Sequence, residues 1–67
     1  MNVAIARKSD ENFTRGEIND ILYMDNNMIT IENKVGNRIR ISVYDDDFLI
    51  LLSASKSEVQ WIANNFF

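Results

Sequence analysis

Two neighbouring segments of this chain alternate between apolar and polar residues, and this alternation constrains the fold more than any other feature. In MITIEN (residues 28–33) and in RIRISVY (residues 38–44), isoleucine or valine recurs two positions apart with polar residues between. Side chains two apart lie on the same face of a strand, so each segment predicts a half-buried strand. The connecting sequence KVGN contains Gly36 and Asn37, which tolerate positive φ. The two segments therefore predict a β-hairpin.

Three further strands are predicted on either side of this hairpin. INDILYM (residues 18–24) leads into it through DNN, a set of turn-forming residues, so residues 18–44 are expected to form a three-stranded meander. In NVAIAR (residues 2–7), Val3 and Ile5 alternate with smaller residues, which predicts a first strand. FLILL (residues 48–52) is apolar at every position, and such a strand requires cover on both faces.

The cover is predicted to come from a C-terminal helix over residues 55–66. Ser55 and Glu58 have the spacing of a capping box, in which each residue bonds the backbone of the other. The residues after them place an apolar stripe at helical spacing, formed by Val59, Ile62, Ala63 and Phe66. So short a helix is marginal alone in water, so we expect it to pack on the outer face of strand 48–52.

The loop lengths indicate how these strands are arranged. A long first connection, KSDENFTRGE (residues 8–17), is followed by two tight turns. This is typical of a small SH3-like barrel, in which five strands curl into two orthogonally packed sheets and the last strand returns beside the first. We therefore predict a mainly β (α+β) fold, a five-stranded SH3-like β-meander barrel with one C-terminal helix. The 67 residues allow one domain, with the barrel over residues 2–52.

Short motifs in the barrel segment also resemble a known group of proteins. FTRGEIN before the second strand, ITIENKVGNRIRIS, and the acidic turn leading to DFLIL are similar to small SH3-like proteins of phages and Gram-positive prophages. Those carry a Thr-x-Gly motif, here Thr14-Arg15-Gly16, and a tight hairpin where this chain has Gly36-Asn37. An aromatic residue commonly stands where this chain has Asn19, and the C-terminal helix lies outside the pattern. The resemblance implies a phage or mobile-element origin and a fold that serves many binding roles.

The residue types argue against catalysis. The chain contains no histidine and no cysteine, so its serines lack the usual activating base and no thiolate or typical zinc site is available. We expect a protein that is not an enzyme and uses no cofactor. The acidic run Asp45-Asp46-Asp47 has an alternative interpretation as a divalent-cation site, but consecutive side chains diverge and the spacing of a calcium loop is missing. We interpret it as a charged turn and predict no metal.

A basic face on the hairpin supports one alternative function. Lys34, Arg38, Arg40 and Tyr44 would share a sheet surface that could contact nucleic acid, and Arg7, Lys8 and Arg15 could extend it. The net charge of −3 favours the other interpretation, a solvated face with cross-strand pairs such as Glu32 with Arg38 or Arg40.

Trp61 is the residue that points most directly to a function. It lies away from the middle of the predicted helical stripe, so it either wraps the edge of the core or faces a partner. With Phe66 and Phe67 it makes the helix apolar on more than one side, as expected for a protein interface, with Leu49 and Leu51 beneath. A homodimer through this region would also enlarge a small core.

We therefore predict a non-catalytic interaction module that binds a host or phage protein and modulates it. The alternatives are a nucleic-acid-binding barrel that uses the Arg38 and Arg40 face, and a purely structural homo-oligomeric subunit. The N-terminal apolar run is too short for a signal peptide and no segment is long enough to span a bilayer, so we expect a cytoplasmic location and no membrane contact.

Overall fold

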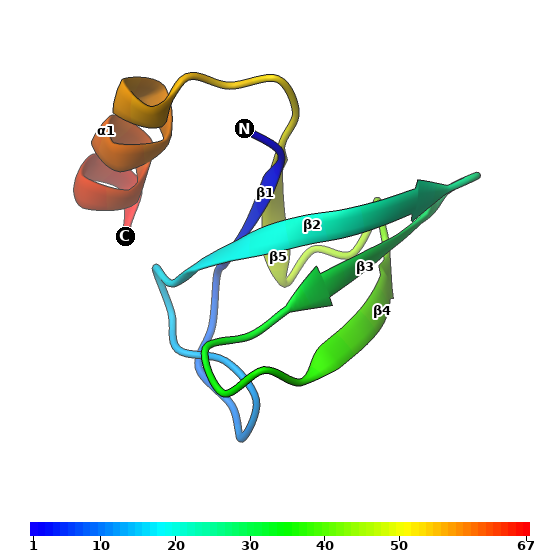
Figure 1. Cartoon of the computed structure of the whole chain (residues 1–67). Coiled ribbons are helices and arrows are strands. Elements are labelled where there is room, and N and C mark those ends of the chain that lie inside the picture. Colours follow the sequence, from blue (N-terminus) through cyan, green and yellow to red (C-terminus); the bar gives the residue numbers. More distant parts are fainter.

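A computed structural model describes residues 1–67 and contains every element that the sequence predicts (Figure 1). The elements are β1 (Val3–Ala6), β2 (Ile18–Asp25), β3 (Met28–Glu32), β4 (Arg38–Ser42), β5 (Phe48–Leu51) and α1 (Lys56–Phe66). Among the ends of these elements, the largest difference from prediction is at the end of β4. The strand stops at Ser42, and the chain enters a turn at Val43 and Tyr44. The fold is therefore mainly β with one C-terminal helix.

The five strands form one antiparallel sheet in the order β4-β3-β2-β1-β5. The prediction that the last strand returns beside the first is confirmed, since β5 pairs with β1 from Val3 opposite Leu51 to Ala6 opposite Phe48. The strand β2 pairs with β1 through its first three residues and with β3 from Asp20 onward, with a shift of register before Tyr23. In place of the expected two orthogonal sheets, the strands form a single curled sheet. No hydrogen-bonded ladder joins the edge strands β4 and β5, so the sheet is a half-barrel and does not close.

Both tight turns of the meander contain a residue with left-handed backbone. Asn26 has a φ of 55° between β2 and β3, and Gly36 has a φ of 89° between β3 and β4. The second turn is held by Asn33, whose backbone carbonyl accepts from the Gly36 N–H and whose side-chain oxygen accepts from the Asn37 N–H. The Asn33 amide also donates to the carbonyl of Asn12 at 3.0 Å, which ties this turn to the long first loop.

The concave side of the sheet holds the larger of two apolar clusters. Its buried members come from four strands and from the first loop, and they are Ala4, Ala6, Phe13, Ile29, Ile31, Ile41 and Phe48. The loop contributes Phe13, whose ring meets that of Phe48 edge to face at a centroid distance of 4.9 Å. The first loop is thus part of the core, although its polar sequence predicts only a connection.

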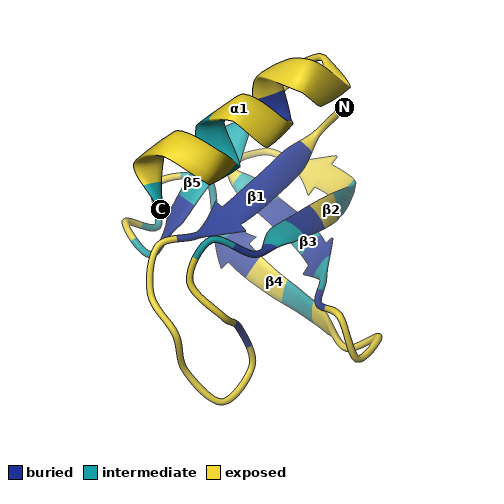
Figure 2. Ribbon diagram, turned by 90° about the vertical axis from the view of Figure 1, so that its left-hand side faces the viewer, coloured by how far each residue is buried: buried dark blue, intermediate teal, exposed yellow.

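The second cluster lies between the sheet and α1. Figure 2 shows the helix lying over β1, every residue of which is buried. Val3 and Ile5 meet Val59 there, and Leu49, Leu51, Ile62, Ala63 and Phe67 surround them. The predicted docking of the helix on the 48–52 strand is therefore corrected: the centre of the contact is β1, with β5 at its side. Because the other face of β1 supports the concave cluster, β1 is covered on both faces.

The predicted apolar stripe of the helix also needs one correction. Phe66 was expected to pack against the sheet, but 62% of its surface is exposed. Phe67, one residue beyond the helix, packs into the cluster in its place. The physical reason is the space beside Gly16, which has no side chain. The Phe67 side chain lies so close there that a Cβ added to Gly16 would be 3.2 Å from the Cβ of Phe67. Phe67 occupies that space, and Phe66 remains at the surface.

A single buried side chain has an unsatisfied atom. The Asn19 side chain in β2 donates through Nδ2 to the carbonyls of Ala4 and Glu17, at 3.1 and 3.2 Å. Its Oδ1 is buried and accepts from no protein group. A polar group thus occupies a position of the sheet that is almost fully enclosed.

No helix of the structure has the length and apolar character needed to cross a membrane.

Candidate interaction surface

The helix α1 begins with a capping box and has one face packed on the sheet. Ser55 Oγ accepts from the Glu58 N–H at 3.1 Å and Glu58 Oε1 accepts from the Ser55 N–H at 3.1 Å, which confirms the predicted capping box. The hydrogen bond from the Ser55 backbone N–H, and after it one from the Ser55 side chain, hold the pKa of the Glu58 carboxyl below its ordinary value. Each residue of a helix is rotated by about 100° around the helix axis from the one before. Trp61 is therefore rotated by about 200° from Val59, which places the two side chains on nearly opposite faces. Because Val59 packs on β1, Trp61 faces outward.

The outward face of the helix carries two aromatic rings. Trp61 is 58% exposed and Phe66 is 62% exposed, and the two rings meet edge to face at a centroid distance of 5.7 Å. We call this pair the aromatic face. The interpretation in which Trp61 wraps the edge of the core is not what the structure shows. From Val59 to Phe67 the chain carries no charged side chain, and the charged groups nearest the aromatic face are Glu58 beside Trp61 and two arginines beside Phe66.

An open cleft adjoins the aromatic face at the end of the helix. It has a volume of about 370 Å³ and is lined by Arg7, Arg15, Leu49, Phe66 and Phe67. The Arg15 guanidinium lies over the Phe67 ring at 5.3 Å from the centroid and donates to the carbonyl of Arg7. We call this the arginine cleft. Of the predicted interface residues, Trp61 and Phe66 are exposed and Leu51 packs beneath the helix. Leu49, Phe66 and Phe67 line the cleft.

The basic face of the hairpin is largely neutralised by neighbouring acids. Three of its predicted members form ion pairs, Lys34 with Glu17 at 3.6 Å, Arg38 with Glu32 at 4.0 Å and Arg40 with Asp25 at 3.6 Å. The expected cross-strand pair of Glu32 is confirmed, because the register places it directly opposite Arg38. Tyr44 is 74% exposed in the turn after β4. The face offers phosphate groups little unpaired positive charge, which weakens the case for nucleic acid.

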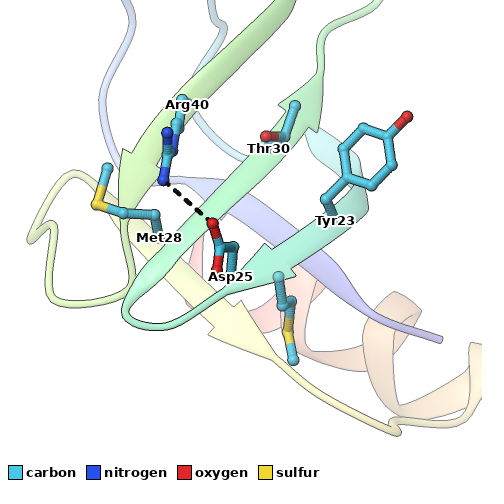
Figure 3. A pocket seen from close by; sticks show the side chains of 6 residues that line it. Tyr23, Asp25, Met28, Thr30 and Arg40 are labelled. Carbon is cyan, nitrogen blue, oxygen red and sulfur yellow. Dashed lines mark ion pairs between the residues drawn. The ribbon is translucent and has the colours of Figure 1, made fainter.

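A second open cleft lies at the tip of the β2–β3 hairpin, and the sequence did not single it out (Figure 3). It measures about 430 Å³ and is lined by Tyr23, Met24, Asp25, Met28, Thr30 and Arg40. Figure 3 shows the Tyr23 ring directed away from the Arg40–Asp25 ion pair, so these groups do not converge on one point. The two methionines near a turn were the only sequence signal for an apolar surface here. The cleft lacks any pairing of a nucleophile with a base.

The acidic run forms the turn between β4 and β5, as its sequence predicts. Asp45 accepts from the Asp47 N–H through its side chain at 2.9 Å, and its backbone carbonyl accepts from the Phe48 N–H at 3.2 Å. Asp47 pairs with Lys8 at 3.1 Å, and this hydrogen bond raises the pKa of the Lys8 ammonium. No cluster of three or more His, Cys, Asp or Glu side chains is placed to hold a metal ion.

Comparisons with protein-family models, with curated proteins and with solved structures found no match to this chain.

Proposed function

We propose that this protein is a non-catalytic protein-interaction module built on an SH3-like half-barrel, and that the aromatic face of α1 is its contact surface. The fold assignment is supported by the curl of the sheet around one apolar cluster and by the return of β5 to β1. The long first loop, which sends Phe13 into that cluster, agrees with the same architecture.

The observation that carries the functional proposal is the exposure of Trp61 and Phe66. Tryptophan is enriched among the residues that dominate protein–protein binding energy, because it buries a large rigid surface at little cost in conformational entropy. Here more than half of the surface of each residue is open to solvent, on a helix whose opposite side is already packed on β1. The folded chain therefore has no internal use for this surface, and a partner that covers it removes a large apolar area from water.

The partner that we propose is a protein of a host cell or of a phage, in the cytoplasm. This choice follows the resemblance of the barrel segment to small SH3-like phage and prophage proteins. A second copy of the chain is a special case of the same proposal. A nucleic-acid partner receives less support, because Lys34, Arg38 and Arg40 each lie beside a carboxylate.

The proposal is tested by comparing two truncations of exposed apolar side chains. Trp61→Ala removes the centre of the aromatic face, and Val35→Ala removes a residue that is 79% exposed on the distant β3–β4 turn. Partners are recovered from host lysate with the wild-type chain, purified, and measured by calorimetry. We expect Trp61→Ala to weaken binding at least about tenfold, as truncation of a central tryptophan does, and Val35→Ala to leave it unchanged.

Two further measurements separate the alternatives. Sedimentation at several concentrations reports self-association: a stable oligomer that recruits no other protein would support the structural-subunit alternative instead. Affinity that falls steeply with salt and with loss of Arg38 would support nucleic acid. A Trp61→Ala chain that is folded and keeps every partner at wild-type affinity contradicts the proposal.

A further inference from the structure

Most of the positive charge of this chain is already paired. Four of the seven basic side chains form ion pairs, namely Lys8, Lys34, Arg38 and Arg40. The three that form none are Arg7, Arg15 and Lys56. Lys56 stands alone in the first turn of α1, whereas Arg7 and Arg15 come together at the arginine cleft. A chain of net charge −3 thus gathers two uncompensated guanidinium groups at one place.

The remaining walls of the arginine cleft are apolar. Leu49 is half-buried, Phe66 is exposed, and the Phe67 ring lies under the Arg15 guanidinium. A guanidinium has five N–H donors. One nitrogen of Arg15 donates to the backbone carbonyl of Arg7, so N–H donors remain free on both side chains. A ligand that suits this cleft has a planar anion beside a bulky apolar group, because arginine binds carboxylate in a forked geometry.

The surroundings of the cleft disfavour a long polyanion. The Arg7 N–H donates to the carbonyl of Asp47 at 2.7 Å, so the turn Asp45-Asp46-Asp47 adjoins the cleft. The next cation along the chain, Lys8, is paired with Asp47. Nucleic acid and anionic bilayers require an extended basic track, and here the track ends after two residues at an acidic turn. A short segment with one or two carboxylates can contact the two arginines without extending over the acidic turn.

We infer that the arginine cleft binds a short acidic segment of the partner protein, in which a carboxylate adjoins a large apolar side chain. The carboxylate binds at Arg7 and Arg15, and the apolar side chain rests on Leu49 and Phe66. This inference rests on the proposed function, because Phe66 belongs to both the aromatic face and the cleft. The partner thereby contacts one continuous surface, which is aromatic along the helix and cationic at the end of the helix.

The experiment uses two blocked peptides of equal size as probes. One is acetyl-Gly-Asp-Phe-Asp-Gly-amide, and the other is its neutral counterpart with asparagine in place of both aspartates. Each is titrated into the full chain while the amide resonances of Leu49 and Phe66 and the fluorescence of Trp61, the only tryptophan, are followed. We expect the acidic peptide to bind with a dissociation constant of about 1 mM or tighter and the neutral one at least about tenfold more weakly.

Two variants of equal charge change show whether the cleft is responsible. Arg7→Gln removes a cleft guanidinium without touching the stack of Arg15 on Phe67, and we expect it to weaken the acidic peptide about tenfold. Lys56→Gln removes an unpaired cation at the opposite end of the helix and is expected to leave the affinity unchanged. Equal losses in both variants, or equal affinity for the two peptides, overturn the inference.

Other occupants give distinct results, each of which also overturns it. Arg7-dependent binding to phosphatidylglycerol vesicles or to a single-stranded oligonucleotide, with no peptide binding, would assign the cleft to a polyanion. A dimer that Arg7→Gln dissociates would assign it to a second copy. If Trp61→Ala abolishes partner binding while Arg7→Gln does not weaken it, the proposed function stands and the cleft inference fails. If Trp61→Ala has no effect on the partner, the proposed function fails, and the peptide titration still judges the cleft.

Discussion

Replacement of Val59 by alanine tests the central contact of the fold, the docking of α1 on β1. The Val59 side chain is only 1% exposed and packs against Val3 and Ile5. Val59→Ala removes two buried methyl groups, worth about 1.6 kcal/mol of transfer free energy, and the partly relaxed cavity adds about 1 kcal/mol. Alanine recovers about 0.5 kcal/mol through its higher helix propensity. The net expected loss in the free energy of unfolding is about 2 kcal/mol.

That loss is large for a chain of this size. At about 2.1 cal/mol/K per residue, the 67 residues have an unfolding entropy of about 0.14 kcal/mol/K. A loss of about 2 kcal/mol therefore lowers Tm by about 14 °C. Far-UV circular dichroism during heating measures the shift, and urea titration shows whether the m-value is unchanged, so that the loss is attributable to the native state.

The matched control is Trp61→Ala on the same helix. Trp61 is 58% exposed, so its truncation is expected to change the free energy of unfolding by less than about 0.5 kcal/mol and Tm by less than about 4 °C. A Tm shift below about 5 °C for Val59→Ala, or a larger shift for Trp61→Ala than for Val59→Ala, would refute the reasoning that α1 docks through Val59.

Four other changes have expected outcomes. Asn19→Asp places a carboxylate where the amide donates to two backbone carbonyls, so we expect a loss of about 3 kcal/mol or more near pH 7. Because burial raises the pKa of that carboxyl, the stability returns as the pH falls through the raised value, and melts at about pH 4 and pH 7 measure the difference. The lowered pKa of Glu58 contributes stability that is present above its unfolded value near 4.5 and is lost as the pH falls through the folded value. The Tm advantage of wild type over Glu58→Gln should therefore shrink in acid. Gly16→Ala adds a Cβ 3.2 Å from that of Phe67 at a φ of 85°, with an expected cost of about 2 kcal/mol in urea denaturation. Gly36→Ala has a similar φ, but its Cβ would meet only Glu32 Oε1 at 3.9 Å, an ordinary contact distance, so it should cost less.

The elements with local signals were predictable from the amino-acid sequence alone. The alternation in residues 28–33 and 38–44, the left-handed turn at Gly36 and the capping box at Ser55 each depend on spacings of a few residues, and all are found in the structure. The same local reasoning placed Trp61 off the packed stripe of the helix. Such features are predictable because the physical interaction and the sequence pattern have the same short range.

Which distant groups meet became known only from the folded structure. It placed Phe13 of a polar loop in the core, moved the centre of helix docking from β5 to β1, and packed Phe67 in place of Phe66 against the sheet. It also left Arg7 unpaired at the cleft while Lys8 found Asp47. These outcomes depend on competition for space and for charge between residues far apart in the chain, and no spacing along the sequence records which competitor is closer in the folded state.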